Sequence, residues 1–520
     1  MSDRIMLIVL NGGFGSRPYP ITAHPDVTEA QLKRVHLADR TSNVNAYPKP
    51  LLPLGGTPLC RPLMEAAIND CCIQDIAMAL MYMPEDFRTY FGPNMENLRG
   101  GSGSSLYWEH QREHNLNTAG CVVKGWSEDL KGIDGSPNIF VIASGDIRMN
   151  LNIGNMFGLH QHHNALISIA LAPVPQSEVG RFGVVYREGD ILDEHQEHQY
   201  NGGKYSRILR FEEKNPNARS NLNNASLYIV DERLLHLIER DVEVAENRNS
   251  GVYHNDWTDP ATGKHYRLGV FSNILNGLGK INEGEVNPNF SDWAHHIFQD
   301  ILTHHHEIYA PNNEKDARGF FGFYYNGLWA DDGTRSAILE ANLDLLREKG
   351  GFGKAYDFDW WPVPYKNRAT DAEGNIIKFG RKTNIETGAE IIGPAIIGDN
   401  VTIRSGARVR NSVIGTGWCL EKGLTLDSTV LLPDRSTLGL KPFQKGLVYR
   451  LPGAFGFEHS IIASGFMERG RTISPFDAGG YYSAVDEVSS ELLDTGNVRF
   501  LRTNNAVVVN PDGEVVRTRL

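Results

Sequence analysis

The sequence predicts an α/β fold in which a mostly parallel sheet domain is followed by a left-handed parallel β-helix. In the first part of the chain, short apolar runs bounded by glycine or polar residues alternate with segments of helical spacing. Behind them, apolar residues recur at every sixth position. The length of 520 residues also exceeds what one ordinary core holds, so at least two domains are expected.

Four short runs are typical of strands that are buried on both faces. They are too short for helices and carry little polar character. Segments of helical spacing lie between them, for example at residues 63–68 and after Pro84. This alternation predicts an open, Rossmann-like, mostly parallel sheet, in which ligands bind outside the carboxyl ends of the strands. The runs are residues 5–10, 76–81, 138–143 and 166–171.

A period of six residues sets the second domain apart. Such a period fits neither a helix nor a flat strand, and ordinary strands with turns would not hold it through five repeats. It fits a left-handed parallel β-helix, in which three hexads form one triangular coil. The phase slips by one residue after Val413. The repeating positions are Ile385, Ile391, Ile397, Ile403 and Val409, and then Ile414, Leu420 and Leu426.

These patterns predict four parts of the chain. Residues 1–355 form the sheet domain, 356–380 a linker and 381–440 the β-helix. Residues 441–520 form a β-rich extension of unknown role, which ends in a hairpin around the turn of Pro511, Asp512 and Gly513.

Composition excludes several classes of partner. The net charge of −12 argues against a nucleic-acid or anionic-membrane surface, because such binding needs basic patches. No apolar run approaches the length of a membrane span, and the first run is too short for a signal peptide. Five cysteines, odd in number and without metal-binding spacing, favour a reducing, cytoplasmic location.

A glycine-rich turn follows the first predicted strand. Gly12, Gly13 and Gly15 fall within four positions, so the backbone can turn tightly and direct successive N–H groups into one concavity that favours an anion. Arg17 adds a cation just beyond this turn, and Lys49 adds a second after an intervening loop. The stretch therefore predicts a phosphate ligand.

An ordered set of motifs resembles the sugar-1-phosphate nucleotidyltransferases, also called nucleotide-sugar pyrophosphorylases, and most closely their ADP-glucose and GDP-mannose branches. The resemblance covers roughly residues 4–346, and a hexad domain is a frequent companion of such a domain. The motifs are Gly12 to Arg17, Tyr47 to Leu54, Leu116 to Gly120, Ser144 to Asp146, Gly183 to Val185, Phe211 to Lys214, Asn224 to Tyr228 and Trp329 to Thr334.

The resemblance implies an enzyme that joins a nucleoside triphosphate to a sugar 1-phosphate and releases pyrophosphate. Close contact of the two polyanions costs on the order of 4 kcal/mol per pair of unit charges, so several cations are required. By resemblance, Arg17 holds the pyrophosphate, Lys49 the α-phosphate and Lys214 the sugar phosphate, while Asp146 and Asp331 hold Mg²⁺.

The resemblance also implies two sets of substrate contacts. The sugar contacts are Gly183, Glu213, Lys214 and Asn224. The nucleotide contacts are Leu10, Asn11, Gly12, Gly13, Gly15, Ser16, Asn117, Thr118 and Gly120.

Some residues depart from the family pattern. Asn11 stands at a usual alanine, and Asn117 at a usual glycine. Asp332 adds a carboxylate beside Asp331, which is expected to affect metal binding. The segment from residue 23 to 46 is longer than the usual spacer and is expected to form a lid or an oligomer contact.

Three functions remain open. The first is the transferase, with a purine triphosphate favoured and with a homo-oligomer, a dimer or tetramer, formed through the β-helix. The second is a bifunctional enzyme with an acyltransferase β-helix, which the few coils and the absence of histidine from the hexads argue against. The third is a regulatory or scaffold homologue that binds nucleotide sugar without turnover.

Overall fold

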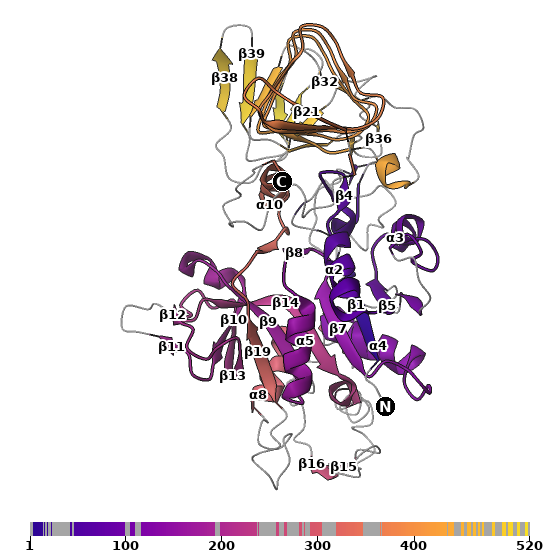
Figure 1. The fold of residues 1–520 in the computed structure, drawn as a ribbon, viewed down its shortest axis with the longest axis vertical. Helices are drawn as coiled ribbons and strands as arrows, with labels where there is room; N and C mark the ends of the chain where they lie inside the picture. The colour runs from indigo at the N-terminus through magenta and orange to yellow at the C-terminus, as the bar shows by residue number, and fades with distance from the viewer. Residues whose placement is uncertain are drawn as a thin grey trace.

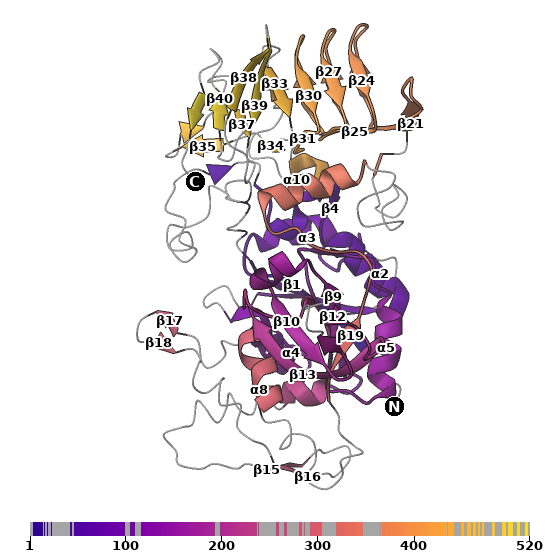
Figure 2. The same cartoon turned by 90° about the vertical axis from the view of Figure 1, so that its left-hand side faces the viewer.

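The computed structural model has a sheet domain, with a stack of short strands at one end of it (Figures 1 and 2). The residues that it describes are 4–13, 15, 18, 22, 42–43, 46–98, 104–109, 116–192, 198–236, 238, 256–258, 265–267, 280–282, 285–286, 292–303, 319–346, 364–365, 367–433, 435–440, 449–451, 455–458, 461–463, 466–468, 471–472, 481–483, 491–495, 498–502, 507–509 and 515–517.

A nine-stranded sheet forms the centre of the first domain. The four predicted strand runs all lie in it as β1, β5, β7 and β9. In order across the sheet the strands are β10 (Gly183–Arg187), β13 (Tyr205–Glu213), β19 (Phe320–Tyr324), β9 (Ile167–Pro173), β14 (Leu222–Asp231), β7 (Ile139–Ser144), β1 (Ile5–Asn11), β5 (Asp75–Leu80) and β6 (Ser105–Trp108).

The sheet is mixed but mostly parallel, as predicted, because seven of its nine strands run in one direction and β13 and β14 run against them. The α/β class is confirmed. β7, β1, β5 and β6 run parallel. β14 is antiparallel to both β7 and β9, and β13 is antiparallel to β10 and β19. A strand that is buried on both faces has the same apolar pattern in either direction, so composition alone does not fix its orientation.

Successive residues of β1 pack into two different cores. Leu7 and Val9 face α2 (Arg61–Cys71) and α5 (Ile153–His162), whereas Met6 and Ile8 face α4 (Asn117–Asp129) and α8 (Phe298–Thr303). All four side chains are buried. This arrangement explains the continuous apolar run, because each face of a central strand must meet a layer of helices.

The hexad region forms three sheets whose parallel strands stack coil upon coil. The described residues between 376 and 463 are here named the β-coil. Seen along the stack in Figure 1, the strands outline a triangle. Ile385 pairs with Ile403 and Ile403 with Leu420, so one coil takes 18 residues and the next 17. This difference accounts for the one-residue slip in the sequence. The parallel stacks begin with β22 (Ile376–Phe379), β23 (Asn384–Ile385) and β24 (Glu390–Ile392), and the antiparallel strand β21 (Asn367–Thr370) lies before β22 in its sheet.

The repeating apolar side chains fill the interior of the β-coil. Ile397, Ile403, Val409, Ile414, Leu420 and Leu426 are fully buried together. Ile385 is 41% exposed, because β23 is the first strand of its sheet among the strands that the structure describes. The parallel stacking agrees with the predicted β-helix, and its left-handed sense stays a prediction.

Parallel stacking continues on both sides of the predicted range 381–440. β22 lies within the predicted linker and pairs with β25 (Ala395–Ile397). Beyond residue 440, β34 (Ile461–Ala463) stacks on β31 (Val430–Leu431), although no hexad period marks it. The predicted hairpin is present as β40 (Val507–Val509) against β41 (Val515–Arg517), while its turn lies outside the described residues.

The β-coil packs directly on the sheet domain. Its Val430, Leu432 and Leu438 belong to the same hydrophobic cluster as Leu51 and Leu54. The helix α10 (Arg335–Asp344) lies between the two parts (Figure 2) and contacts β3 (Pro53–Leu54) on one side and β31 on the other. The two parts therefore share one core and do not sit at the ends of a free linker.

Polar contacts fix the segment that leads to Lys49. The Tyr47 hydroxyl donates to the Pro433 carbonyl oxygen at 3.0 Å. The buried guanidinium of Arg435 donates to the Ala46 carbonyl oxygen and pairs with Asp86 at 2.5 Å. The β-coil thus holds both the lysine segment and the helix α3 (Pro84–Phe91), which carries Asp86. Of the predicted lid at residues 23–46, only Ser42, Asn43 and Ala46 are described, and β2 (Ser42–Asn43) pairs with β35 (Phe466–Glu468).

Within the described parts of the chain, none of the helices is long and apolar enough to cross a membrane. All five cysteines are free thiols.

Arg435→Met is expected to destabilise the fold by about 3–5 kcal/mol at neutral pH, because it leaves a buried carboxylate without its partner. Burial raises the pKa of Asp86, and Arg435 opposes this rise. Without Arg435 the pKa rises further, so the folded state binds the proton more tightly than the unfolded state does. The loss of stability should therefore be smaller at about pH 5 than at about pH 8.

Urea denaturation of wild type and variant, followed by tryptophan fluorescence at both pH values, tests this expectation. Arg381→Met is the matched control, because the Arg381 side chain is 86% exposed and pairs with Asp399 at 3.4 Å. Equal effects of the two substitutions would contradict the structural role of Arg435.

Candidate functional site

A cavity of about 340 Å³ opens at the carboxyl ends of β1, β5 and β7. Its volume is that of a small-molecule site. Seven predicted nucleotide, phosphate or metal residues line it together, although they come from four separate segments. They are Leu10, Gly12, Gly13, Lys49, Asn117, Thr118 and Asp146.

The glycine turn is described in part. Gly12 and Gly13 line the cavity, whereas Ser16 and Arg17 lie outside the described residues. Gly15 has a φ of +64°, and a Cβ there would lie 3.0 Å from the Thr22 side chain. The Thr22 hydroxyl donates to the Gly15 carbonyl oxygen at 2.6 Å, and the Thr22 carbonyl accepts from Tyr82 at 2.5 Å. A positive φ and a close neighbour together explain glycine at position 15.

Lys49 is buried in the short helix η1 (Lys49–Leu51). Pro48 and Pro50 flank it and restrict the backbone. Its ammonium group donates to Asp146 Oδ2 and lies 3.9 Å from Asp331 Oδ1. Lys49 therefore meets both predicted metal ligands at once, a contact that its sequence motif did not predict.

Asp146 and Asp331 are brought together by a two-stranded ribbon. β8 (Ile147–Met149) pairs antiparallel with β20 (Trp329–Asp331), with Ile147 opposite Asp331. The Asp332 amide also donates to the Asp146 carbonyl oxygen at 3.3 Å. The Ser144 hydroxyl donates to the Asp146 carboxylate and orients it.

Two carboxylates suit a hard divalent cation that takes its remaining ligands from substrate. Within the described residues, no cluster of three or more His, Cys, Asp or Glu side chains could hold a metal ion. Mg²⁺ is commonly bound by one or two carboxylates together with phosphate oxygens. The donor set of Asp146 and Asp331 therefore fits the predicted Mg²⁺, with substrate phosphates completing the coordination.

Asp332 is held by an arginine of the neighbouring strand, and its expected effect on metal binding stays a prediction. It is fully buried and accepts from Arg148 Nε and, at 3.1 Å, from Arg148 Nη2. Arg148 Nη2 also lies 3.8 Å from Asp344 of α10. Burial raises the pKa of Asp332 to about 6, while Arg148 lowers it. The extra carboxylate is thus neutralised by Arg148 on the strand beside Asp331.

Two non-glycine residues at the rim of the cavity have left-handed backbone. Asn117 has a φ of 60° and Ser226 a φ of 57°. Both line the cavity. Asn117 stands where the family usually has glycine, and Asn is one of the residues that tolerate this region. The departure at Asn117 therefore keeps the backbone shape of a glycine loop.

Three other residues that were predicted to contact the nucleotide lie among side chains and backbone of the protein itself. The Thr118 hydroxyl donates to Asp292 at 2.8 Å. Gly120 is buried within α4 and does not line the cavity. Asn11 is 1% exposed, and its side-chain amide finds no hydrogen-bond partner within the described residues. A Cβ on Gly145 would lie 1.8 Å from Asn11 Oδ1, so the pair requires glycine at position 145.

The predicted sugar residues lie beside this cavity and do not line it. Gly183 pairs with Glu213 across β10 and β13, and a Cβ on Gly183 would lie 2.5 Å from Glu213 Oε2. The exposed Lys214 ammonium lies 3.2 Å from Glu213 Oε1. Asn224 donates to the Tyr228 hydroxyl at 3.1 Å, and Tyr228 lines the cavity. Tyr228 therefore joins the two predicted halves of the site.

Several lining residues were not predicted from the sequence. Tyr228 and Ser226 lie in the motif from Asn224 to Tyr228, but the sequence assigned no function to these two residues. Met81 follows β5, so the rule that ligands bind at strand ends could have found it. The unpredicted residues are Pro50, Met81, Cys121, Ser144, Ser226 and Tyr228.

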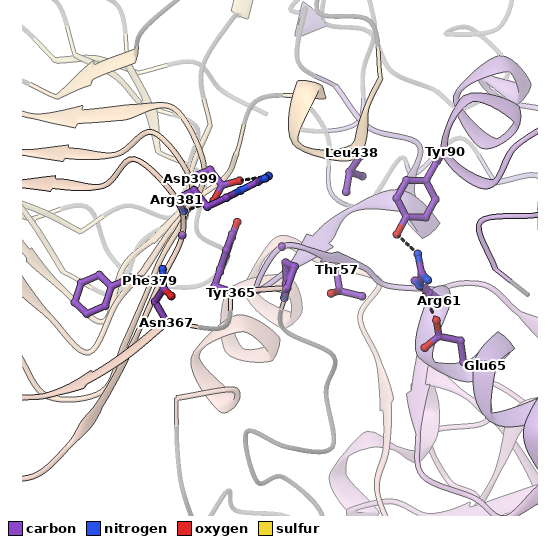
Figure 3. A pocket seen from close by; sticks show the side chains of 13 residues that line it. Thr57, Arg61, Glu65, Tyr90, Tyr365, Asn367, Phe379, Arg381, Asp399 and Leu438 are labelled. Carbon is purple, nitrogen blue, oxygen red and sulfur yellow. Dashed lines mark hydrogen bonds and ion pairs between the residues drawn. The ribbon is translucent and has the colours of Figure 1, made fainter. Parts of the chain in front are cut away.

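A second and larger cavity, of about 750 Å³, lies between the sheet domain and the β-coil (Figure 3). On one side Arg61 contacts Glu65 at 2.7 Å and Tyr90 at 2.9 Å, and on the other Arg381 contacts Asp399. Among the residues that the structure describes, none of those predicted to bind substrate or metal lines it. Size alone therefore does not identify the nucleotide site.

Residues 44–348 match the nucleotidyl transferase family. The chain belongs to this family. The predicted resemblance to sugar-1-phosphate nucleotidyltransferases is confirmed, and the match includes Lys49, Asp146 and Asp331. The glycine turn lies before the matched range, so its assignment rests on its place at the end of β1.

Curated relatives are similar at low identity. A glucose-1-phosphate adenylyltransferase from Clostridium kluyveri is 23% identical over 392 residues, which are 74% of this chain and 80% of the relative. Proteins of the same name from Lachnospira eligens and Acetivibrio thermocellus are each 24% identical. The match with the Lachnospira eligens protein covers 72% of this chain and 69% of the relative, and that with the Acetivibrio thermocellus protein covers 68% of this chain and 73% of the relative.

Arg148→Met is expected to destabilise the fold by about 3–5 kcal/mol, because it leaves the buried carboxylate of Asp332 without its arginine. It should also lower nucleotidyl transfer, because Arg148 supports the ribbon that places Asp331 opposite Ile147. Arg187→Met is the matched control, since Arg187 pairs with Asp190 at 2.9 Å in an equally buried place outside the cavity lining.

Urea denaturation and initial rates are measured for both variants. Both should lose stability, but only Arg148→Met should lose kcat beyond the unfolded fraction. An equal loss of kcat in both variants would contradict the positioning role.

Proposed function

We propose that this chain transfers a nucleotidyl group from a nucleoside triphosphate to a sugar 1-phosphate, and that it releases pyrophosphate. The observation that carries the proposal is the meeting of Lys49, Asp146 and Asp331 beside the glycine turn at the carboxyl end of the sheet. Family membership shows an enzyme of the sugar-1-phosphate nucleotidyltransferase type. The individual residue roles belong to the proposal.

The reaction needs positioning and charge neutralisation more than covalent chemistry. An oxygen of the sugar phosphate attacks the α-phosphorus in line. The bond from that phosphorus to the bridging oxygen of the β-phosphate breaks, and pyrophosphate leaves with that oxygen. Fixed cations and backbone N–H groups lower the barrier by stabilising the charge that develops.

Each of the proposed residues acts on a particular phosphate group of the two substrates. Gly12 and Gly13 give the triphosphate close access to the strand end, and Lys49 neutralises the α-phosphate. Arg17 holds the pyrophosphate, and Lys214 approaches the sugar phosphate. When bound at Asp146 and Asp331, Mg²⁺ supplies charge neutralisation to the phosphates.

Substrate identity follows as a narrower proposal. The curated relatives are named adenylyltransferases of glucose 1-phosphate. ATP with glucose 1-phosphate is therefore the first pair to test, and GTP is the other purine triphosphate. We further propose a left-handed β-helix for the β-coil, a homo-oligomer formed through it, and a cytoplasmic location.

A panel of triphosphates and sugar 1-phosphates, read by pyrophosphate release, tests the function. Asp146→Asn should lower the best activity by at least about 100-fold. Circular dichroism should show that the variant keeps the fold, because Asp331 still lies beside the Lys49 ammonium group. If the wild-type protein binds nucleotide sugar but releases no pyrophosphate with any pair, the proposal of an enzyme is wrong. The alternative of a regulatory or scaffold homologue would then take its place.

Glu213→Gln tests the sugar half of the site. Loss of a hydrogen bond to a charged group costs about 1.5–3 kcal/mol, so the KM for sugar 1-phosphate should rise by roughly 10-fold or more. The KM for the triphosphate should not change, because Glu213 lies outside the nucleotide cavity.

Glu212→Gln is the control for this measurement. Glu212 precedes Glu213 on β13, points to the opposite face and accepts from Tyr186 at 3.2 Å. A rise in the KM for the triphosphate, or an equal effect of Glu212→Gln, would contradict the assignment of Glu213.

A further inference from the structure

We propose that the ammonium group of Lys49, in the protein without substrate, holds the place between Asp146 and Asp331 that a divalent cation takes. The Lys49 ammonium group would leave this place when a divalent cation is held by Asp146 and Asp331, and it could then meet the α-phosphate. The inference deepens the proposed function and rests on it for the role of the α-phosphate. The exchange of the two cations is a separate property of the protein alone.

The geometry of one buried cation and two carboxylates carries the proposal. The Lys49 ammonium contacts Asp146 and lies 3.9 Å from Asp331, and the three side chains are 7%, 23% and 14% exposed. Water therefore screens this group little, and the carboxylates need a positive partner. Lys49 supplies this partner.

The same two carboxylates cannot hold both cations in this arrangement. A divalent ion bound between them would lie against an ammonium group, and like charges at such short range repel strongly when screening is weak. Magnesium also requires nearly ideal octahedral coordination and keeps several waters or phosphate oxygens. Binding of the ion therefore requires the ammonium group to leave.

Lys49 is built for such a movement. Its backbone is held by Pro48 and Pro50, and the Leu51 amide donates to the Pro48 carbonyl oxygen at 2.8 Å. The anchored segment also contacts the β-coil through Tyr47. The Cα of Lys49 is thus fixed, while its flexible four-carbon stem leaves the charged end free to turn. The cavity that Lys49 lines gives this end a place to go.

The exchange would link the two charges that the reaction needs. Without the ion, Lys49 is held by the carboxylates and is withheld from a phosphate. With the ion, the carboxylates are neutralised, and a second cation becomes available in the same cavity.

Mn²⁺ binding in the absence of nucleotide, measured by electron paramagnetic resonance, tests the exchange. Lys49→Met should bind Mn²⁺ about ten-fold more tightly than wild type, which corresponds to an ammonium engaged in about nine of ten molecules. Lys49→Arg keeps the charge and should show no gain. The double variant with Asp146→Asn should lose the gain, which assigns the binding to this site. Mn²⁺ affinity in Lys49→Met equal to or weaker than that of wild type would overturn the proposal.

A second measurement uses the wild-type protein and needs no variant to fold. Amine-reactive labelling followed by mass spectrometry should modify Lys49 faster when Mg²⁺ or Mn²⁺ is added. Lys378 of β22 is the matched control, because it is 4% exposed and lies in the β-coil. A rate at Lys49 that stays constant or falls, or an equal rise at Lys378, would overturn the exchange.

Both readouts omit the sugar phosphate and the triphosphate. A protein that shows the exchange but releases no pyrophosphate in the substrate panel would contradict the proposed function and leave the exchange standing. A protein that releases pyrophosphate but shows no gain in Mn²⁺ affinity and no labelling change would contradict the exchange alone.

Discussion

The candidate site depends on one electrostatic contact, in which Lys49 meets the carboxylates of Asp146 and Asp331. The three residues belong to segments that are far apart in the sequence, and each segment is held by different neighbours. Proline residues hold the lysine, a sheet strand ends just before Asp146, and a short ribbon carries Asp331. A buried cluster of this kind persists only if its charges compensate one another. The fold around it is arranged to bring them together.

Support for this contact extends beyond the sheet domain. Arg435 and Pro433, at the side of the β-coil, hold the chain immediately before Lys49, and Arg148 holds the residue immediately after Asp331. Both arginines are buried, and both neutralise carboxylates that would otherwise be costly to bury. The β-coil is therefore part of the support of the site. A shift at its contact with Ala46 would change the position of Lys49.

Much of the architecture could be predicted from the sequence, because the spacing of single apolar residues follows the repeat of the structure. The six-residue spacing from Ile385 to Val409 corresponds to the stacked coils, and the slip after Val413 corresponds to a coil of 17 residues. The reversed direction of β14 could not be predicted, because this strand is buried on both faces and its apolar pattern is the same in either orientation. The coils beyond residue 440 were missed, because the stacking of Ile461 on Val430 continues without the hexad period.

The site was predicted as a set of residues but not as a set of contacts. Motifs named Lys49, Asp146 and Asp331 separately, and only the fold shows that they touch. The pairing of Asp332 with Arg148 could not be predicted, since the two residues lie 184 positions apart and no local pattern joins them. The positions of Ser16 and Arg17 stay predictions, because they lie outside the described residues.

A crystal structure with Mg²⁺ and a non-hydrolysable triphosphate analogue tests nucleotidyl transfer at this site most directly. The expected result is a triphosphate at Gly12 and Gly13, an ion bound by Asp146 and Asp331, and the Lys49 ammonium turned toward the α-phosphate. A nucleotide bound elsewhere, for example in the larger cavity between Arg61 and Arg381, with Lys49 still paired to Asp146, would contradict the account.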